Sequence, residues 1–407
     1  MVGTRPAMTQ DGARAREVRS SLAADGPLCT RPFVLTCLAT FFFYLSFCFI
    51  LPVMPLYVED LGGSPAQLGL IIGGFAFTAM LLRPPGGWII DTRGNRPVLL
   101  AGMAIFMLAS LGYVVFRSVN AILLLRLFHG IGMGLFPTAA TVVVAELSPL
   151  ARRGEAMGWF GIANSVALIL GPAAGTSVAG RLGYPVLFLV AGGTAFLGLL
   201  CILLLPRIGQ PSGWTGSVRW GDFFSRAALL PSSVLLFLCL PYGMMVAFIP
   251  IIAARRGLGN PGTFYTAFAL AAFLVRAKAG EMSDRRGRSA VILPGMLLAA
   301  LAFTVLGVTS GPIGVLTGAA IFGLASGSAQ PALMALTTDR VPPEERGKAM
   351  GTFYTAWELG ISAGATGSGL LLDVVDFPVL LLLAALFPAA GALLSLRARA
   401  PARVRSA

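Results

Sequence analysis

The sequence predicts an all-α membrane protein whose twelve transmembrane helices form two six-helix bundles. Hydrophobic residues make up 56% of the 407-residue chain and charged residues only 12%, whereas soluble domains carry about 25% charged residues. A charged hairpin motif also recurs at a constant offset of 193 positions, from Arg83 to Arg276 and from Gly94 to Gly287. A constant offset over a whole motif indicates that half of the molecule is duplicated.

Twelve segments are long and apolar enough to cross a lipid bilayer, which takes about 20 residues per helix. In chain order they are 33–57, 66–90, 97–117, 121–146, 155–180, 184–206, 232–254, 262–284, 290–310, 313–339, 348–372 and 377–396. The first six form a predicted bundle over 33–206 and the last six a second over 231–396. A polar, turn-rich linker at 207–230 joins them, and cytoplasmic tails are predicted at 1–32 and 397–407.

The positions of Lys and Arg predict the orientation, because basic residues that flank membrane spans are retained in the cytoplasm. With both termini inside, most of the 30 basic residues are cytoplasmic. The exceptions are Arg117, Arg181, Arg255 and Arg256 outside, and Arg83, Arg126, Arg276 and Lys278 within spans. The net charge of +13 therefore indicates topology and an attraction to membrane lipid rather than to nucleic acid. We expect a multi-pass protein of a bacterial-type cytoplasmic membrane.

The residue chemistry does not indicate an enzyme. The five cysteines form no CxxC pair and the chain has one histidine, so we predict small core cysteines, no metal site and no cofactor. The sequence contains no GxxxxGK[ST] phosphate loop and no HExxH motif. A serine nucleophile with a histidine and a third partner is also missing.

The repeated hairpin resembles the loop signature of the major facilitator superfamily, in which glycine, aspartate, glycine and basic residues follow at fixed spacing. Its residues are Gly87, Asp91, Arg93, Gly94 and Arg96 in one copy and Gly280, Asp284, Arg286, Gly287 and Arg288 in the other. The resemblance implies a transporter with the major facilitator fold over residues 33–396.

Together with Glu146 and Asp339 at the ends of equivalent spans, these loops are predicted to form a gate. The aspartates would pair with arginine or face a helix N-terminus of the opposite half. The alternative is that the charges only set topology and cap helices.

Two further stretches resemble the drug/proton antiporter branch of the superfamily. Pro52 and Pro55 match its paired prolines, which bend a helix by removing backbone hydrogen bonds. Gly171, Pro172 and Gly175 match the fifth-span pattern of the antiporters. This resemblance implies efflux, with the glycines letting the opposite halves approach closely and seal the path. Ordinary helix packing is the alternative for the glycines.

Glu358 is the acidic residue that lies well inside a span, near the bilayer midplane. Burial favours a protonated carboxylate and a nearby arginine favours the charged form, so such a group can exchange one proton per cycle. We therefore predict that Glu358 couples transport to protons, with Arg126 as the charge that substrate or proton competes against.

Arg126 resembles the family's buried arginine followed by glycines. A charge in hydrocarbon costs about 2.5–3.5 kcal/mol, so Arg126 is expected to face a cavity, although structural pairing alone would also explain it. His129 is predicted to act either as a proton relay or as a hydrogen-bonding neighbour of Arg126.

Six aromatic and amide residues lie at depths suited to a substrate cavity, although each is also explained by packing. They are Tyr44, Phe47, Asn164, Tyr242, Gln330 and Trp357. The predicted function is proton-coupled efflux of a small amphipathic or drug-like molecule by a monomer. A proton symporter or facilitator that imports a small metabolite is the alternative, and the sequence leaves the substrate's charge open.

Overall fold

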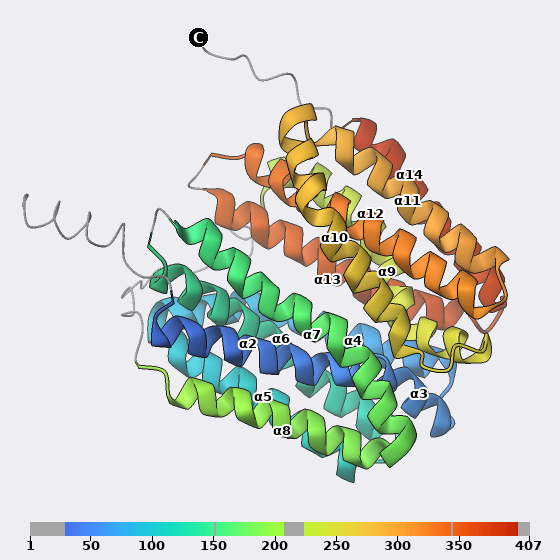
Figure 1. The fold of residues 1–407 in the computed structure, drawn as a ribbon, viewed down its shortest axis with the longest axis horizontal. Coiled ribbons are helices and arrows are strands. Elements are labelled where there is room, and N and C mark those ends of the chain that lie inside the picture. Colours follow the sequence, from blue (N-terminus) through green and yellow to red (C-terminus); the bar gives the residue numbers. More distant parts are fainter. Residues whose placement is uncertain (1–28, 150–151, 207–223, 343–344, 398–407) are drawn as a thin grey trace, which may run out of the picture.

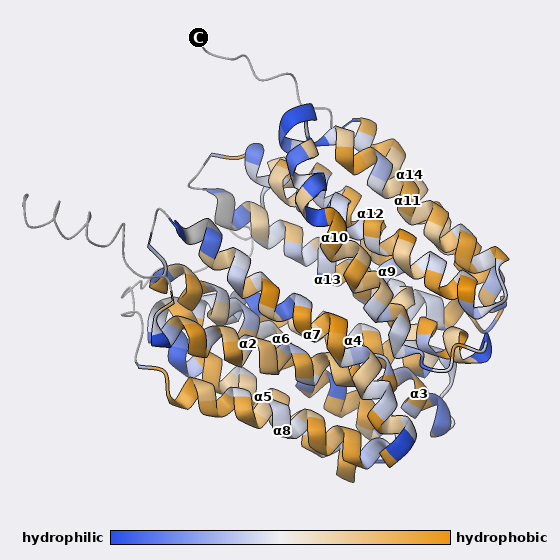
Figure 2. Cartoon of the chain, in the orientation of Figure 1, coloured by the Kyte–Doolittle hydropathy of each residue, from blue (hydrophilic) through white to orange (hydrophobic). Residues whose placement is uncertain are grey.

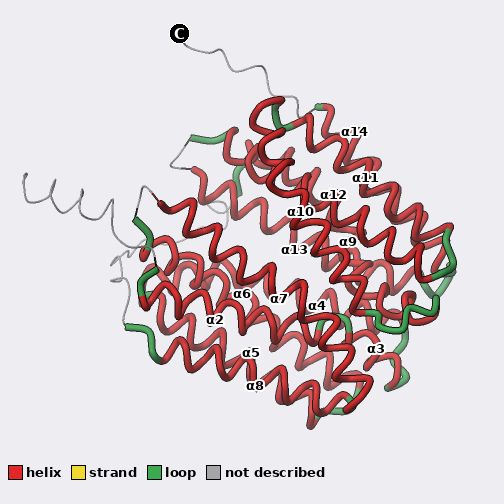
Figure 3. Tube along the Cα trace, viewed as in Figure 1, coloured by secondary structure: helices red, strands yellow, loops and turns green. Residues whose placement is uncertain are grey.

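A computed structural model describes residues 29–149, 152–206, 224–342 and 345–397, and all regular structure in these residues is helical (Figure 3). The first bundle contains α2 (Arg31–Ile50), α3 (Val53–Asp60), α4 (Pro65–Arg93), α5 (Asn95–Val115), α6 (Val119–Leu147), α7 (Arg153–Leu182) and α8 (Tyr184–Leu203). The second contains the 3-10 turn η3 (Arg226–Ala228), α9 (Leu229–Arg255), α10 (Gly262–Arg286), α11 (Ser289–Val308), α12 (Pro312–Asp339), α13 (Arg346–Leu371) and α14 (Phe377–Leu396).

The predicted fold of twelve membrane helices in two bundles is confirmed, with α2 and α3 together forming the first of them (Figure 1). Most of the predicted tails and linker, at 1–28, 207–223 and 398–407, lies outside the described residues. The first membrane helix is broken where the paired prolines predict a bend. α2 ends at Ile50, and Pro52, which has no N–H to continue the ladder, precedes the start of α3 at Val53.

Two membrane helices, α10 and α13, are more polar than the other ten. The ten are long and apolar enough to cross a membrane by themselves. α10 contains Arg276, Lys278 and Glu281 in its second half, and Figure 2 shows blue, hydrophilic bands in this helix. α13 contains Glu358 at its centre. Since charged residues in a membrane face other helices or water, this polarity fits the contacts that α10 and α13 make with the first bundle.

The bundles meet mainly through two helix crossings, α4 with α13 and α7 with α10, and α9 also contacts α3 and α4. We call the end with the turns at Gly94 and Gly287 the basic end, and the end with the turns at Gly62 and Gly257 the opposite end. Small residues allow the close approach at these crossings.

The bundles are closed toward the opposite end and separated toward the basic end. A Cβ at Gly69 of α4 would lie 2.6 Å from the carbonyl oxygen of Ala365 on α13. By contrast, a Cβ at Gly87 or Gly280, near the basic end of α4 and α10, would meet no atom within 4 Å. The structure therefore represents a state of the fold that is open at the basic end.

The duplication seen in the sequence is preserved in the two crossings. Gly73 of α4 approaches the backbone of Ser362 on α13, and a Cβ there would lie 2.7 Å from its carbonyl oxygen. At the positions offset by 193, Thr266 of α10 donates a 2.8 Å hydrogen bond to the carbonyl oxygen of Ile169 on α7. The two crossings thus have the same register, although their side chains differ.

Candidate functional site

An ion pair joins the two bundles in the middle of the molecule. Arg83 Nη2 of α4 donates to Glu358 Oε1 of α13 at 2.5 Å, and the side chains are 26% and 8% exposed. The Arg83 guanidinium also lies 5.5 Å from the centre of the Tyr354 ring. Pro84 and Pro85 follow Arg83 inside α4, and because neither has an N–H to donate, the helix is locally weakened next to the charge.

Glu358 occupies the place that the sequence predicts for a buried acid. It is the thirteenth of 26 residues in α13 and is 6% exposed, so it lies about 18 Å along the helix from Arg346 at 1.5 Å per residue. Its partner Arg83 is a residue that sequence reasoning assigned no coupling role. The sequence feature that could have identified Arg83 is its position as a basic residue inside a span.

Arg126 does not face a cavity in this structure, so that expectation is wrong for the state described here. It is 1% exposed inside the first bundle, where its guanidinium lies 4.3 Å from the centre of the Phe75 ring. Arg126 Nη1 donates to His129 Nδ1 at 3.4 Å, and the Tyr113 hydroxyl lies 3.1 Å from the same nitrogen. Aromatic faces and a neutral ring, rather than a carboxylate, surround this charge.

The contacts of His129 favour one tautomer of its ring. A guanidinium can only donate hydrogen bonds, so the Arg126 contact assigns Nδ1 as the acceptor. His129 Nε2 and Arg126 Nε are buried without a partner among the described residues. The interpretation of His129 as a hydrogen-bonding neighbour of Arg126 matches this geometry, and a relay role stays a prediction.

The predicted gate residues of the second half form a cluster at the basic end. Arg288 donates to Asp339 at 2.9 Å and to Ser283 at 3.1 Å, and it also pairs with Asp284. Burial lowers the pKa of Arg288, but its hydrogen bonds to the two aspartates outweigh burial and raise the pKa above its usual value. Asp284 therefore pairs within its own half, not with the opposite one.

In the first half the corresponding groups are paired differently. Asn95 donates a 2.7 Å hydrogen bond to Glu146, and Arg96 donates to the carbonyl oxygen of Leu203 at 3.2 Å. The Asp91 side chain lies outside the described residues. Arg93 of α4 is exposed, as is Arg286 of the second half. Glu146 and Asp339 thus lie in separate clusters, each closed within one bundle.

The fifth-span glycines face their own bundle, which corrects the expectation that they seal the two halves together. A Cβ at Gly171 would lie 2.5 Å from that of Cys48 on α2, and Gly175 packs against Phe49 of the same helix. The residue of this motif that meets the other bundle is Pro172, whose carbonyl oxygen contacts Gly262 of α10. The two glycines therefore pack within the first bundle, whereas Pro172 lies at the crossing of α7 with α10.

Polar contacts that sequence reasoning missed hold the opposite end together. Asn260, just before α10, donates to the carbonyl oxygen of Ala173 at 3.0 Å and to Ser177 Oγ at 2.9 Å, both on α7. Arg255 of α9 pairs with Glu59 of α3 at 2.6 Å. The one sequence feature that could have identified these contacts is that Arg255 is among the few basic residues predicted on the outer side of the membrane.

The predicted cavity residues lie at mid-depth but form separate contacts. Tyr242 and Trp357 rings lie 5.5 Å apart in the second bundle, while Phe47 stacks on Phe75 in the first at 5.6 Å. Tyr44 and Gln330 are half-buried, and Asn164 of α7 is exposed.

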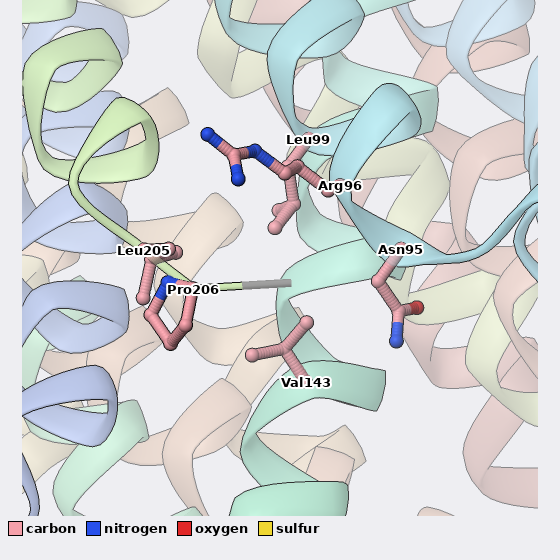
Figure 4. A pocket seen from close by; sticks show the side chains of 6 residues that line it. All are labelled: Asn95, Arg96, Leu99, Val143, Leu205 and Pro206. Atoms are coloured by element: carbon pink, nitrogen blue, oxygen red, sulfur yellow. The ribbon is translucent and has the colours of Figure 1, made fainter. Parts of the chain in front are cut away.

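A shallow hollow lies elsewhere, near the basic end (Figure 4). It is lined by Asn95, Arg96, Leu99, Val143, Leu205 and Pro206. None of the predicted cavity residues lines it. In the described part of the chain, no three His, Cys, Asp or Glu side chains gather as a metal site needs.

Two helical bundles that meet around a mid-membrane ion pair, open at one end and closed at the other, are the architecture of a membrane transporter. The sequence profile of the Major Facilitator Superfamily matches residues 36–277 and 262–407. The chain belongs to this superfamily.

Among its relatives is an uncharacterized MFS-type transporter of Methanocaldococcus jannaschii, 23% identical over 364 residues that cover 86% of this chain and 93% of the relative. The chain is also similar to the quinolone resistance protein NorA of Staphylococcus aureus, with 26% identity over 199 residues that cover 46% of this chain and 51% of NorA.

Two solved structures share the fold. A POT family transporter in complex with 5-aminolevulinic acid has a TM-score of 0.80, 14% identity, and coverage of 90% of this chain and 96% of its own. The nucleoside transporter NupG has a TM-score of 0.75, 14% identity, and coverage of 91% and 100%.

Proposed function

We propose that this transporter is a proton-coupled exporter of a small amphipathic or drug-like molecule and works by alternating access. The observation that carries the proposal is the Arg83–Glu358 ion pair, which lies between the bundles where their close contact gives way to open space. The similarity of half of the chain to NorA and the antiporter-like fifth span support efflux over import.

In the proposed cycle Glu358 is charged and paired with Arg83 while the basic end is open. Substrate that enters from the basic end competes with this pair, and the bundles rock to open the opposite end, where the substrate leaves. A proton from that side then binds a Glu358 oxygen and removes its negative charge, so the attraction between the bundles is that of a neutral hydrogen bond while they rock back. Loss of the proton through the basic end restores the charged pair and completes the cycle.

We further propose that the basic end faces the cytoplasm, as the distribution of Lys and Arg predicts. Both termini then lie in the cytoplasm, and the protein works as a monomer in the cytoplasmic membrane. Protons entering through the opposite end would drive substrate out through it. The bundles at 33–206 and 231–396 are the two moving bodies in this proposal.

The test is Glu358→Gln in proteoliposomes with an imposed pH gradient. The substitution keeps the size of the side chain but removes the proton site, so we expect substrate-dependent proton flux to fall to the level of empty vesicles. Glu155→Gln is the matched control, since Glu155 is an exposed acid that pairs with Arg152 at the start of α7. Undiminished flux in Glu358→Gln would remove Glu358 from the mechanism, and substrate movement in the same direction as protons would favour the symporter.

A further inference from the structure

Arg276 is a cation in the middle of a membrane helix. It lies ten residues before the last residue of α10, Arg286, and its side chain is exposed. No described residue forms a hydrogen bond or ion pair with it. A guanidinium at this depth is costly in hydrocarbon, so an exposed one is expected to face water or a ligand.

In the internal repeat, the position equivalent to the carboxylate partner of Arg83 holds no acid at the crossing that contains Arg276. Arg276 is related to Arg83 by the offset of 193, and Ser165 of α7 is related to Glu358 by the same offset. The two crossings have the same register at Thr266 and Ile169, so Arg276 and Ser165 hold the helix positions that Arg83 and Glu358 hold at the other crossing. The position of the carboxylate, however, is taken by Ser165, whose hydroxyl donates to the carbonyl oxygen of Gly161 at 3.0 Å.

No acid of the two crossing helices neutralises Arg276. The carboxylates on α7 and α10 each have another cation, in the pairs Glu155–Arg152, Glu281–Arg285 and Asp284–Arg288. The Arg83–Glu358 pair is neutral as a whole. The face between α7 and α10 therefore carries an uncompensated positive charge, which attracts an anion and repels a cation.

We propose that Arg276 is a substrate-binding residue that pairs with a carboxylate of the exported molecule, at the position where Ser165 replaces the acid of the other crossing. Arginine suits this role because its planar donors match a carboxylate bidentately. The inference rests on the proposed transport function and narrows it, since the amphipathic substrate becomes an organic acid. Asn164, exposed on α7 beside Ser165, is the neighbouring polar group.

The first test measures the electrostatic potential near Arg276 in the absence of substrate. In protein carrying Asn164→Cys, reaction rates with an anionic sulfonatoethyl and a cationic trimethylammonioethyl methanethiosulfonate are compared, after subtraction of the rate without this cysteine. We expect Arg276→Gln to lower the anion-to-cation rate ratio several-fold. Arg276→Lys should preserve the ratio and show that the fold is intact, and Lys278→Gln is the matched control. An unchanged ratio in Arg276→Gln would overturn the proposal.

The second test asks for carboxylate recognition. Nalidixic acid and its methyl ester are compared as protectants of Asn164→Cys against a neutral maleimide. We expect the acid to slow labelling at least fivefold more than the ester, with the difference lost in Arg276→Gln and in Ser165→Glu, which supplies an internal partner. Equal protection by acid and ester would overturn the proposal. Neither test measures flux. The labelling results therefore do not depend on the proton-flux result for Glu358→Gln, and failure of this proposal is distinguished from failure of the proposed function.

Discussion

The Arg83–Glu358 pair is expected to set the balance between the two states of the transporter. The perturbation is Glu358→Gln, which replaces the charged acceptor by a neutral amide of the same shape. Glu358 lies on α13 and Arg83 on α4, so the pair holds the two bundles in the arrangement that is open at the basic end. Its loss should shift the population toward the state open at the opposite end.

The size of this shift can be worked from the exposure of the pair. Hydrogen bonds to charged groups contribute about 1.5–3 kcal/mol, and solvent around Arg83, which is 26% exposed, favours the lower half of this range. A change of about 2 kcal/mol corresponds to roughly a thirtyfold change in the ratio of the two states. A population dominated by one state would become a mixture.

The assay is a distance measurement between spin labels at Gly87→Cys and Gly280→Cys. Both positions have open space around them, so labels there should not disturb packing, and they lie on opposite bundles near the basic end. We expect a long distance in the parent protein and a shorter one to gain population in Glu358→Gln. Arg93→Gln, which removes an exposed charge from the same helix as Arg83, is the control.

A double-mutant cycle decides whether the effect belongs to the pair. Arg83→Gln, Glu358→Gln and the double variant should shift the populations by similar amounts, because each removes the same interaction. Additive shifts from the two single variants would refute the reasoning. A change in the population ratio of less than about threefold in Glu358→Gln would refute it as well.

Three further changes test other parts of the structure. Gly69→Leu forces a side chain against an α13 carbonyl oxygen that lies 2.6 Å from an ideal Cβ at this position. Overpacking of about 1–3 kcal/mol should then abolish transport. Gly180→Leu, which places the same side chain in open space, should not. Asn260→Ala removes three side-chain hydrogen bonds to α7, at about 1 kcal/mol each, and should raise the rate at which Asn164→Cys is labelled from the opposite end at least tenfold; an unchanged rate would show that Asn260 does not hold this end closed. Arg288→Ala leaves two aspartates unpaired and should lower the melting temperature by a few degrees, while Arg286→Ala at an exposed site should leave it unchanged.

The fold was predictable because its signals are local and repeated. Apolar segments of fixed length mark the helices, and the offset between Arg83 and Arg276 marks the duplication before any contact is known. The break between Ile50 and Val53 was also predictable, since Pro52 cannot donate a backbone hydrogen bond whatever surrounds it.

The site was less predictable because it depends on which helix faces which. Sequence reasoning identified Glu358 from its depth but not its partner, since Arg83 and Glu358 are 275 positions apart. It placed Arg126 toward a cavity from the cost of a buried charge, but Phe75 and His129 surround the guanidinium inside the bundle instead. Helix rotation is not encoded in the length and hydropathy of a segment.

The contrast between the two crossings explains how a duplicated protein can acquire a directional function. Two identical halves would give two identical ion pairs, and each would respond to protonation in the same way. Here one crossing has Arg83 with Glu358, while at the other the equivalent acid position holds Ser165. In the mechanism that we propose, the first crossing senses protons while the second leaves Arg276 for an anion, so that proton and substrate act on different helix pairs of the same rocking structure.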